Sequence, residues 1–215
     1  MYKENTPRRI PETSVRRLPA YLRALSRINA DRVTSDALGH AAGYSSEQVR
    51  KDLAYFGAFG TRGVGYDVIM LREEIRRILR LDKGIRAVVI GAGRLGTALV
   101  RYTDESARDV TIASVVDVNP SVIGTRMGQL TVESMDQLEA IIKDRDIGMG
   151  VITVPAQSAP IVCQRLVDAG VRAILNFAPA TLMVDNPEVV IQQIDLTLEM
   201  QALAYFAKAA EKARP

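Results

Sequence analysis

A glycine cluster near the middle of the chain follows one apolar segment and precedes another segment of helical character. Residues 87–90 suit a buried strand, and residues 97–102 suit a helix. Strand, glycine turn and helix in this order are typical of a dinucleotide-binding fold, because the glycines let the backbone approach a pyrophosphate at the helix N-terminus. The candidate cofactor-binding residues of this turn are Gly91, Ala92, Gly93, Arg94, Leu95 and Gly96. Residues 1–83 come before this unit, so we expect something other than a substrate domain at the front of the chain.

An acidic residue follows the glycine cluster at the end of the next predicted strand. Asp117 lies close to the ~20-residue offset from Gly96 at which an acidic side chain accepts hydrogen bonds from the adenosine ribose. A carboxylate there repels a 2′-phosphate and therefore favours NAD over NADP. The alternative interpretation is an aspartate that ends a strand and begins the turn 117–120.

Charge is distributed unequally between the two halves of the chain. Residues 1–83 hold 16 Lys and Arg against 10 Asp and Glu, a net charge of +6, whereas residues 84–215 hold 12 against 15, a net charge of −3. A basic front half favours a polyanionic partner, with nucleic acid as the first candidate. The single cysteine, Cys163, fits a reducing cytoplasm, and no apolar run approaches the ~20 residues that span a bilayer.

The front half is predicted to be a winged helix-turn-helix domain over residues 1–83. Helices are expected over 14–29, from Thr34 or Ser35 to 42, and over 45–56 with Ser45 as its cap. Pro19 marks either the first turn of the first helix or a kink in it. Glycines at 57, 60, 63 and 65 suit a two-stranded wing, and a basic amphipathic helix over 71–81 leads to the boundary at Lys83 and Gly84.

The second half alternates strand-like and helix-like segments, which predicts a mostly parallel α/β sheet, a Rossmann domain over residues 84–194. Strands are expected at 86–90, 110–116, 147–154 and 172–176, with shorter ones near 129–132 and 189–194. Helices are expected at 94–103, 134–143 and 157–169. A last helix, over 196–213, has an apolar face wider than one neighbour needs.

The predicted third helix carries the candidate DNA-binding residues. Arginine and glutamine can read base edges, while lysine and tyrosine can hold phosphates. The alternative is a solvated charged face, but the wing and the basic charge favour DNA. The candidates are Ser46, Gln48, Arg50, Lys51, Tyr55 and, at the tip of the wing, Arg62.

Several segments together resemble the Rex family of bacterial redox-sensing repressors. They are residues 48–57 (QVRKDLAYFG) with 61–66 (TRGVGY), Arg17-Leu18-Pro19, the glycine cluster, residues 153–156 (TVPA), residues 174–179 (ILNFAP) and residues 194–196 (IDL). The resemblance covers nearly the whole chain in the family's order. It implies a homodimer whose last helix, within residues 195–215, is swapped into the partner subunit.

The resemblance also implies a function and further site residues. NADH and NAD⁺ would be effectors, NADH releasing the repressor from DNA, and two symmetry-related helix-turn-helix modules imply an inverted-repeat operator. Arg17, Tyr102 and Asp195 would form switching contacts, with Asp195 exchanging between the arginine and the tyrosine. The residues implied near the nicotinamide are Thr153, Pro155, Asn176, Phe177 and Pro179.

The dinucleotide-binding pattern also leaves two other functions open. A small NAD-dependent oxidoreductase needs a positioned acid beside the nicotinamide, but His40 falls in the helix-turn-helix, Cys163 suits an apolar filler, and Tyr102 has no lysine near it in sequence. We therefore expect no catalytic residue, no enzymatic activity and no metal. A Rossmann domain for coenzyme A or another nucleotide is the third possibility, against which Asp117 argues.

Overall fold

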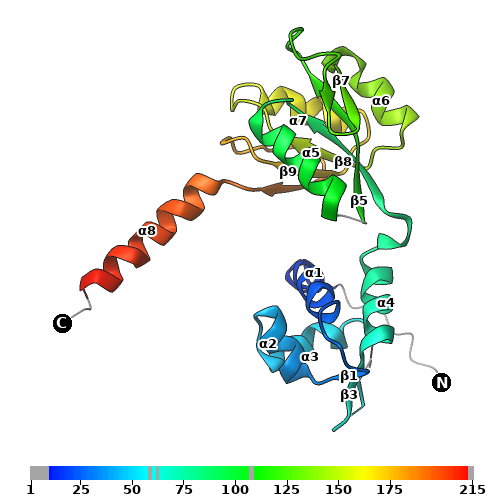
Figure 1. The fold of residues 1–215 in the computed structure, drawn as a ribbon, viewed down its shortest axis with the longest axis vertical. Coiled ribbons are helices and arrows are strands. Elements are labelled where there is room, and N and C mark those ends of the chain that lie inside the picture. The colour runs from blue at the N-terminus through cyan, green and yellow to red at the C-terminus, as the bar shows by residue number, and fades with distance from the viewer. Residues whose placement is uncertain (1–9, 58–59, 62, 107–108, 213–215) are drawn as a thin grey trace. The chain divides into compact units, whose positions relative to one another are not determined.

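The chain forms two compact units, Met1–Lys83 and Gly84–Pro215, each described here by itself (Figure 1). The computed structural model describes residues 10–57, 60–61, 63–106 and 109–212. Among the helices of these residues, none combines the length and the apolar character that crossing a membrane requires.

The first unit has the predicted winged helix-turn-helix architecture. Its helices are α1 (Glu12–Leu25), α2 (Ser35–Ala42), α3 (Ser46–Ala54) and α4 (Val68–Ile78), followed by a short 3₁₀ turn, η1 (Leu81–Lys83). The wing is the antiparallel pair of β2 (Gly60–Thr61) and β3 (Gly65–Asp67). A strand that was not predicted, β1 (Arg32–Val33), pairs with the other edge of β3. Arg62 at the tip of the wing lies outside the described residues.

Side-chain caps set the helix boundaries of this unit. Of the two candidate caps of α2, Thr34 is the one whose Oγ1 accepts from the Ala37 N–H. Ser45 Oγ accepts from the Gln48 N–H at the start of α3, as predicted. α4 begins three residues before its predicted start because Asp67 accepts from the Met70 N–H and caps it there. Gly43, with a φ of 80°, ends α2 in the left-handed conformation that favours glycine.

The first helix differs from its prediction at both ends and at its proline. α1 begins directly after Pro11 and ends at Leu25, so Pro19 lies inside the helix. Of the two alternatives for Pro19, the first turn is therefore wrong, and the kink stays a prediction. Pro19 has no N–H to donate to the helix, but α1 is stabilised because its apolar face is buried in the core of the unit. That core holds Leu18, Tyr21, Leu25, Leu38, Val49, Leu53, Leu71 and Ile75.

The second unit is the predicted Rossmann domain, with a sheet in the order β10-β9-β8-β4-β5-β7-β6. The strands are β4 (Ile85–Ile90), β5 (Val110–Asp117), β6 (Arg126–Met127), β7 (Leu130–Ser134), β8 (Met149–Ile152), β9 (Ala173–Asn176) and β10 (Val190–Gln193). Neighbours from β10 to β7 pair in parallel, and the unpredicted β6 joins β7 antiparallel. In chain order, β5 and β7 are added on one side of β4, and β8, β9 and β10 are added later on the other side.

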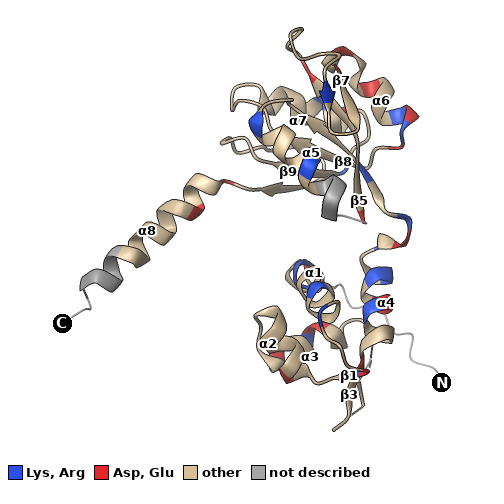
Figure 2. Ribbon diagram, viewed as in Figure 1, with Lys and Arg blue, Asp and Glu red and all other residues tan. Residues whose placement is uncertain are grey.

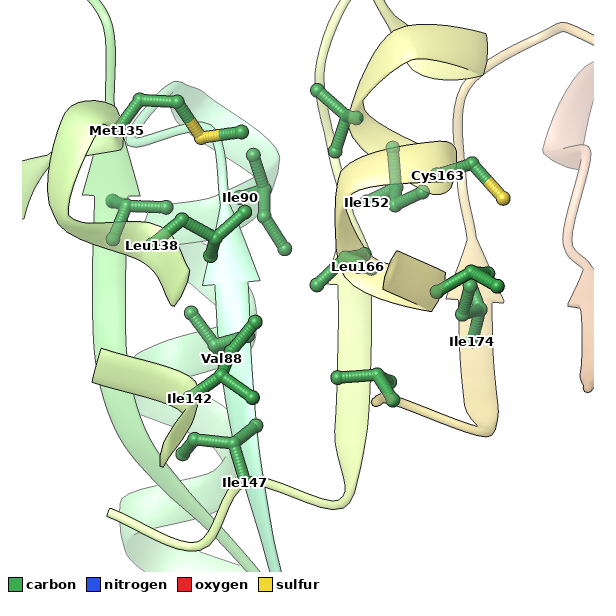
Figure 3. Close-up of a cluster of buried hydrophobic side chains, with 14 of the residues drawn as sticks. Val88, Ile90, Met135, Leu138, Ile142, Ile147, Ile152, Cys163, Leu166 and Ile174 are labelled. Atoms are coloured by element: carbon green, nitrogen blue, oxygen red, sulfur yellow. The ribbon is translucent and has the colours of Figure 1, made fainter. Parts of the chain in front are cut away.

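Helices cover both faces of this sheet. They are α5 (Arg94–Ser106), α6 (Leu138–Asp144), preceded by the 3₁₀ turn η2 (Met135–Gln137), and α7 (Ala159–Asp168). Val88 and Ile90 of β4 pack against α6 and α7 on one face, as Figure 3 shows. Ala87 and Val89 lie in a second cluster with Val100 of α5 on the other face. The first strand of the domain is therefore buried on both faces, as a central parallel strand should be.

The last helix, α8 (Leu196–Lys212), leaves its apolar side chains exposed within the chain. The exposed apolar residues are Leu196, Leu198, Met200, Leu203, Tyr205 and Phe206. Exposed apolar side chains gathered on one helix indicate a surface that contacts another molecule.

Candidate functional site

The glycine turn after β4 is closely packed at two of its glycines and open at the third. Gly91 has a φ of 105°, and a Cβ on it would lie 2.9 Å from the Thr153 carbonyl oxygen. A Cβ on Gly96 would lie 2.0 Å from the Gly91 carbonyl oxygen, whereas one on Gly93 would meet nothing within 4 Å. The first and last glycines thus shape the turn, and Gly93 leaves its backbone accessible to a ligand.

Asp117 lies beside this turn at the carboxyl end of β5. Its Oδ2 accepts a hydrogen bond from the Ala92 N–H at 2.6 Å, and its Oδ1 accepts from the Asn119 N–H at 2.8 Å. The two interpretations of Asp117 are therefore compatible, because the carboxylate both begins a turn and adjoins the glycine cluster. Asp117 is half-buried and lines the cavity beside the glycine turn.

A cavity of about 220 Å³ joins several of the predicted residues. It lies at the carboxyl ends of β4, β5 and β8, where the strand order reverses, the place where open α/β sheets bind ligands. The lining residues are Ile90, Gly91, Gly93, Asp117, Val118, Met135, Thr153, Val154, Pro155, Ser158 and Val162. Arg94 and Leu95 are exposed at the start of α5, beside this cavity's glycines.

Thr153 supports the glycine turn in addition to lining the cavity. Its hydroxyl lies 2.9 Å from the carbonyl oxygens of both Ile90 and Gly91. The Thr153 hydroxyl, directly after β8, thus links the end of β8 to the end of β4. This role was not predicted from the sequence, because it depends on the pairing of two strands far apart in the chain.

Three other residues that the resemblance placed near the nicotinamide do not line this cavity. Asn176 is fully buried, with its Nδ2 donating to Gln193 Oε1 at 2.6 Å and its Oδ1 accepting from the Ala178 N–H at 3.0 Å. Its side chain therefore holds the turn after β9. Phe177 is half-buried against the cluster around Val89, and Pro179 is exposed. Their contact with a nicotinamide stays a prediction.

The predicted DNA-binding residues of α3 fall into two groups. Arg50 and Lys51 are exposed, whereas Ser46, Gln48 and Tyr55 are half-buried. Arg50 Nη1 donates to Ser35 Oγ at 2.9 Å, which places the guanidinium over the start of α2. A cavity of about 510 Å³ between α3 and the wing is lined by Thr34, Ser35, Arg50, Leu53, Ala54, Gly57, Gly60, Thr61, Gly63, Gly65 and Tyr66. Lys and Arg also lie along α1 and α4 of this unit (Figure 2).

The main residue that the sequence did not reveal is Asp52 of α3, a fully buried carboxylate. It accepts from Ser14 Oγ at 2.8 Å, from Tyr21 Oη at 2.7 Å and from Gln48 Nε2 at 2.8 Å. Arg17 adds a two-point contact, with Nε at 2.6 Å and Nη2 at 2.7 Å. The donors from α1 lie three and four residues apart, so they share one face of that helix.

These contacts determine the protonation of the cluster. Burial by itself raises a carboxyl pKa, but the hydrogen bonds from Arg17, Tyr21, Ser14 and Gln48 outweigh it and hold the pKa of Asp52 below its usual value. The hydrogen bond to Asp52 raises the pKa of Arg17. Burial, followed by the same carboxylate, raises the pKa of Tyr21. Asp52 and Arg17 are therefore a charged pair at neutral pH.

The three predicted switching residues are distributed over both units. Arg17 contacts Asp52 within the first unit, and its guanidinium lies 6.0 Å from the centre of the Tyr44 ring. Tyr102 is exposed on α5. Asp195 is half-buried and begins α8, where its Oδ1 accepts from the Thr197 N–H at 2.9 Å. The exchange of Asp195 between Arg17 and Tyr102 stays a prediction.

The residues considered for catalysis are placed unfavourably for it. His40 is exposed on α2 in the first unit. Cys163 is buried in the core of the second unit, as the filler interpretation predicted, and burial raises the pKa of its thiol. A buried neutral thiol is a poor nucleophile.

Comparison with known proteins covers both units. Residues 82–180 match the CoA binding domain family, and residues 9–54 match the family described as putative DNA-binding protein N-terminus. The chain is 43% identical to the redox-sensing transcriptional repressor Rex of Natranaerobius thermophilus, over 92% of this chain and 91% of that protein. It is 44% identical to the Rex repressor of Streptomyces coelicolor, over 96% of this chain and 81% of that protein.

Solved structures agree with these relatives. The crystal structure of RSP in complex with β-NAD⁺ and operator DNA matches with a TM-score of 0.86 and 32% identity, covering 94% of each chain. The structure of RSP with β-NADH matches with a TM-score of 0.81 and 30% identity, covering 94% of this chain and 96% of that one. Sequence and structure thus agree over nearly the whole length, and this chain belongs to the Rex family of redox-sensing transcriptional repressors.

Proposed function

We propose that this chain is a repressor whose affinity for DNA depends on the ratio of NADH to NAD⁺. The observation that carries the proposal is the open glycine turn beside Asp117, in a chain whose other unit is a basic winged helix. The protein works as a homodimer in the cytoplasm and binds an inverted-repeat operator. NADH favours a form whose two α3 helices no longer fit the operator, so NADH releases the DNA.

The ligand site is assigned by its chemistry. Gly93 and the start of α5 would hold the pyrophosphate, because the helix dipole and the N–H groups of a first turn favour an anion. Asp117 accepts from the adenosine ribose, which selects NAD over NADP. The nicotinamide would lie near Thr153 and Pro155, which line the cavity, and near Asn176, Phe177 and Pro179, as the resemblance implies.

The α8 helix and the switching residues complete the proposal. The exposed apolar stripe of α8 is buried in the partner subunit as a swapped helix. Asp195 then contacts Arg17 in the DNA-binding form and Tyr102 in the NADH-bound form.

Thermodynamic linkage makes the two binding events reciprocal. If NADH weakens DNA binding tenfold, DNA weakens NADH binding tenfold, which is about 1.4 kcal/mol of coupling.

The proposal is tested by fluorescence anisotropy of a labelled inverted-repeat duplex, titrated with NADH and separately with NAD⁺. Release by NADH at concentrations where NAD⁺ has little effect is the expected result. DNA binding that responds to neither dinucleotide contradicts it. Competition between NADH and coenzyme A for the protein tests the other nucleotide that a Rossmann domain of this kind can bind. Release of the duplex by coenzyme A in place of NADH would overturn the ligand assignment.

Arg50→Ala should weaken binding of the duplex by about tenfold or more, because one well-placed arginine contact contributes roughly 1–3 kcal/mol. NADH affinity should not change. The same anisotropy titration without dinucleotide measures the effect. Arg23→Ala is the matched control, since it removes the same charge from an exposed position near the end of α1, outside the cavity that Arg50 lines. Equal losses in both variants would mean that only net charge matters.

A further inference from the structure

The contacts of Asp52 join the helix that carries Arg17 to the helix that carries the candidate DNA-binding residues. Ser14, Arg17 and Tyr21 of α1 all donate to this carboxylate, and Gln48 of α3 donates to it four residues before Asp52 in the same helix. Asp52 is fully buried, while the Arg17 side chain keeps 19% of its surface exposed. One end of the ion pair is therefore fixed in the core, and the other reaches the surface of the unit.

The way in which Arg17 meets Asp52 leaves part of the guanidinium available. Among the described residues, the hydrogen bonds of Arg17 come from Nε and Nη2, and both end on Asp52. A guanidinium has a second edge, formed by Nη1 and Nη2, which can bind another carboxylate in the same two-point manner. The Tyr44 ring beside the guanidinium further limits its orientation. Asp52 and Tyr44 thus hold Arg17 in one orientation, in which its hydrogen bonds with the described residues leave Nη1 for a second carboxylate.

We infer that Asp52 is a positioning residue for the redox switch: it orients Arg17 for a second carboxylate and transmits that contact to α3 through Gln48. The inference rests on the proposed function, in which Asp195 supplies the second carboxylate. An Arg17 without Asp52 samples many rotamers, so the incoming carboxylate has to order a flexible side chain. The Gln48 amide, which Asp52 holds at 2.8 Å, also loses its fixed place on α3.

The measured quantity is the coupling factor, the ratio of the duplex Kd at saturating NADH to the Kd without it. Asp52→Asn keeps the size of the side chain and removes the charge that binds Arg17. We expect its coupling factor to fall from the tenfold or more typical of allosteric pairs toward unity. NADH affinity without DNA, followed by NADH fluorescence, should stay as in the wild type. A preserved coupling factor would overturn the inference.

A double-mutant cycle separates positioning from a merely structural role. If Asp52 acts through Arg17, Asp52→Asn should change the coupling factor no further in an Arg17→Gln background. Independent, multiplying losses would show that Asp52 acts by another route and would overturn the inference. Arg16→Gln is the matched control, because it removes the same charge from the next position of α1, where the guanidinium binds the exposed Glu12. Its coupling factor should stay as in the wild type, and an equal loss there would also overturn the inference.

Two further results keep the test decisive. If Asp52→Asn fails to fold by circular dichroism, Arg17→Lys takes its place. Lysine keeps the charge but lacks the two edges of a guanidinium, so the coupling factor should still fall, and a retained coupling factor would overturn the inference.

The wild type is measured first. A wild type that NADH does not release refutes the proposed function, whereas a released wild type with an equally released Asp52→Asn variant refutes only the role of Asp52.

Discussion

Gly93→Ala is expected to weaken NADH binding at least tenfold, about 1.4 kcal/mol, and to leave the thermal unfolding midpoint unchanged. A Cβ at this position meets nothing within 4 Å, and the φ of Gly93 lies outside the left-handed region, so the fold accepts the methyl group. The methyl group instead occupies the space where the pyrophosphate approaches the backbone. NADH fluorescence titration and differential scanning calorimetry measure the two quantities.

Gly96→Ala provides the contrasting variant within the same turn. Its Cβ would lie 2.0 Å from the Gly91 carbonyl oxygen, so the turn must move, and the unfolding midpoint should fall together with NADH affinity. A Gly93→Ala protein that binds NADH like the wild type would show that the dinucleotide does not cross this turn. DNA binding without dinucleotide should be retained in Gly93→Ala, because Gly93 belongs to the unit that lacks α3.

Under the proposed function, in which α8 holds two subunits together, Leu203→Glu is expected to dissociate the homodimer at micromolar concentration and thereby reduce operator affinity by several orders of magnitude. The Leu203 side chain is 65% exposed within the chain and belongs to the apolar stripe of α8. Burying one leucine side chain contributes roughly 1.5–3 kcal/mol, and placing a carboxylate in the same apolar interface adds a desolvation penalty. Analytical ultracentrifugation measures the subunit equilibrium, and anisotropy measures the binding of full and half operator sites.

The matched control for this charge is Gln201→Glu, two residues earlier in the same helix. It adds the same carboxylate at an exposed position that is already polar. The control should remain dimeric and keep its operator affinity. A dimeric Leu203→Glu protein that NADH still releases would mean that α8 does not hold the two subunits together.

Local chemistry made much of the fold predictable. Ser45 was predicted as a cap, and Thr34 as one of two candidates with Ser35, because hydroxyl side chains before an apolar-periodic segment satisfy the first N–H groups of a helix. The order of strand, glycine turn and helix predicted the position of the cavity at the end of β4. The strands β1 and β6 were missed because two residues are too few for a periodic pattern.

Tertiary contacts explain the features that could not be predicted. Arg17 and Asp52 are charged residues in helices whose other charges face solvent, so nothing local marks them as a buried pair. The three donors of α1 lie 31 to 38 residues from Asp52 in the sequence. The contact of Asn176 with the ligand, which the resemblance implies, stays a prediction, and the sequence did not reveal that the Asn176 amide donates to the Gln193 side chain of β10. The hydrogen-bond partners of a polar residue at a strand end therefore become known only when the neighbouring strands are known.

The burial of Cys163 has a consequence for the kind of signal that the protein can report. Its thiol, the only one in the sequence, lies in the core shared by α7 and the sheet with 2% of its surface exposed, and burial raises its pKa. Peroxide and disulfide reagents act on accessible thiolates, so they have little to attack here. Under the proposed function, the repressor reports the reduction of a diffusible carrier and is not switched by oxidation of its own thiol. Its response also reverses by simple exchange of one ligand for another, without a reductase to repair the protein.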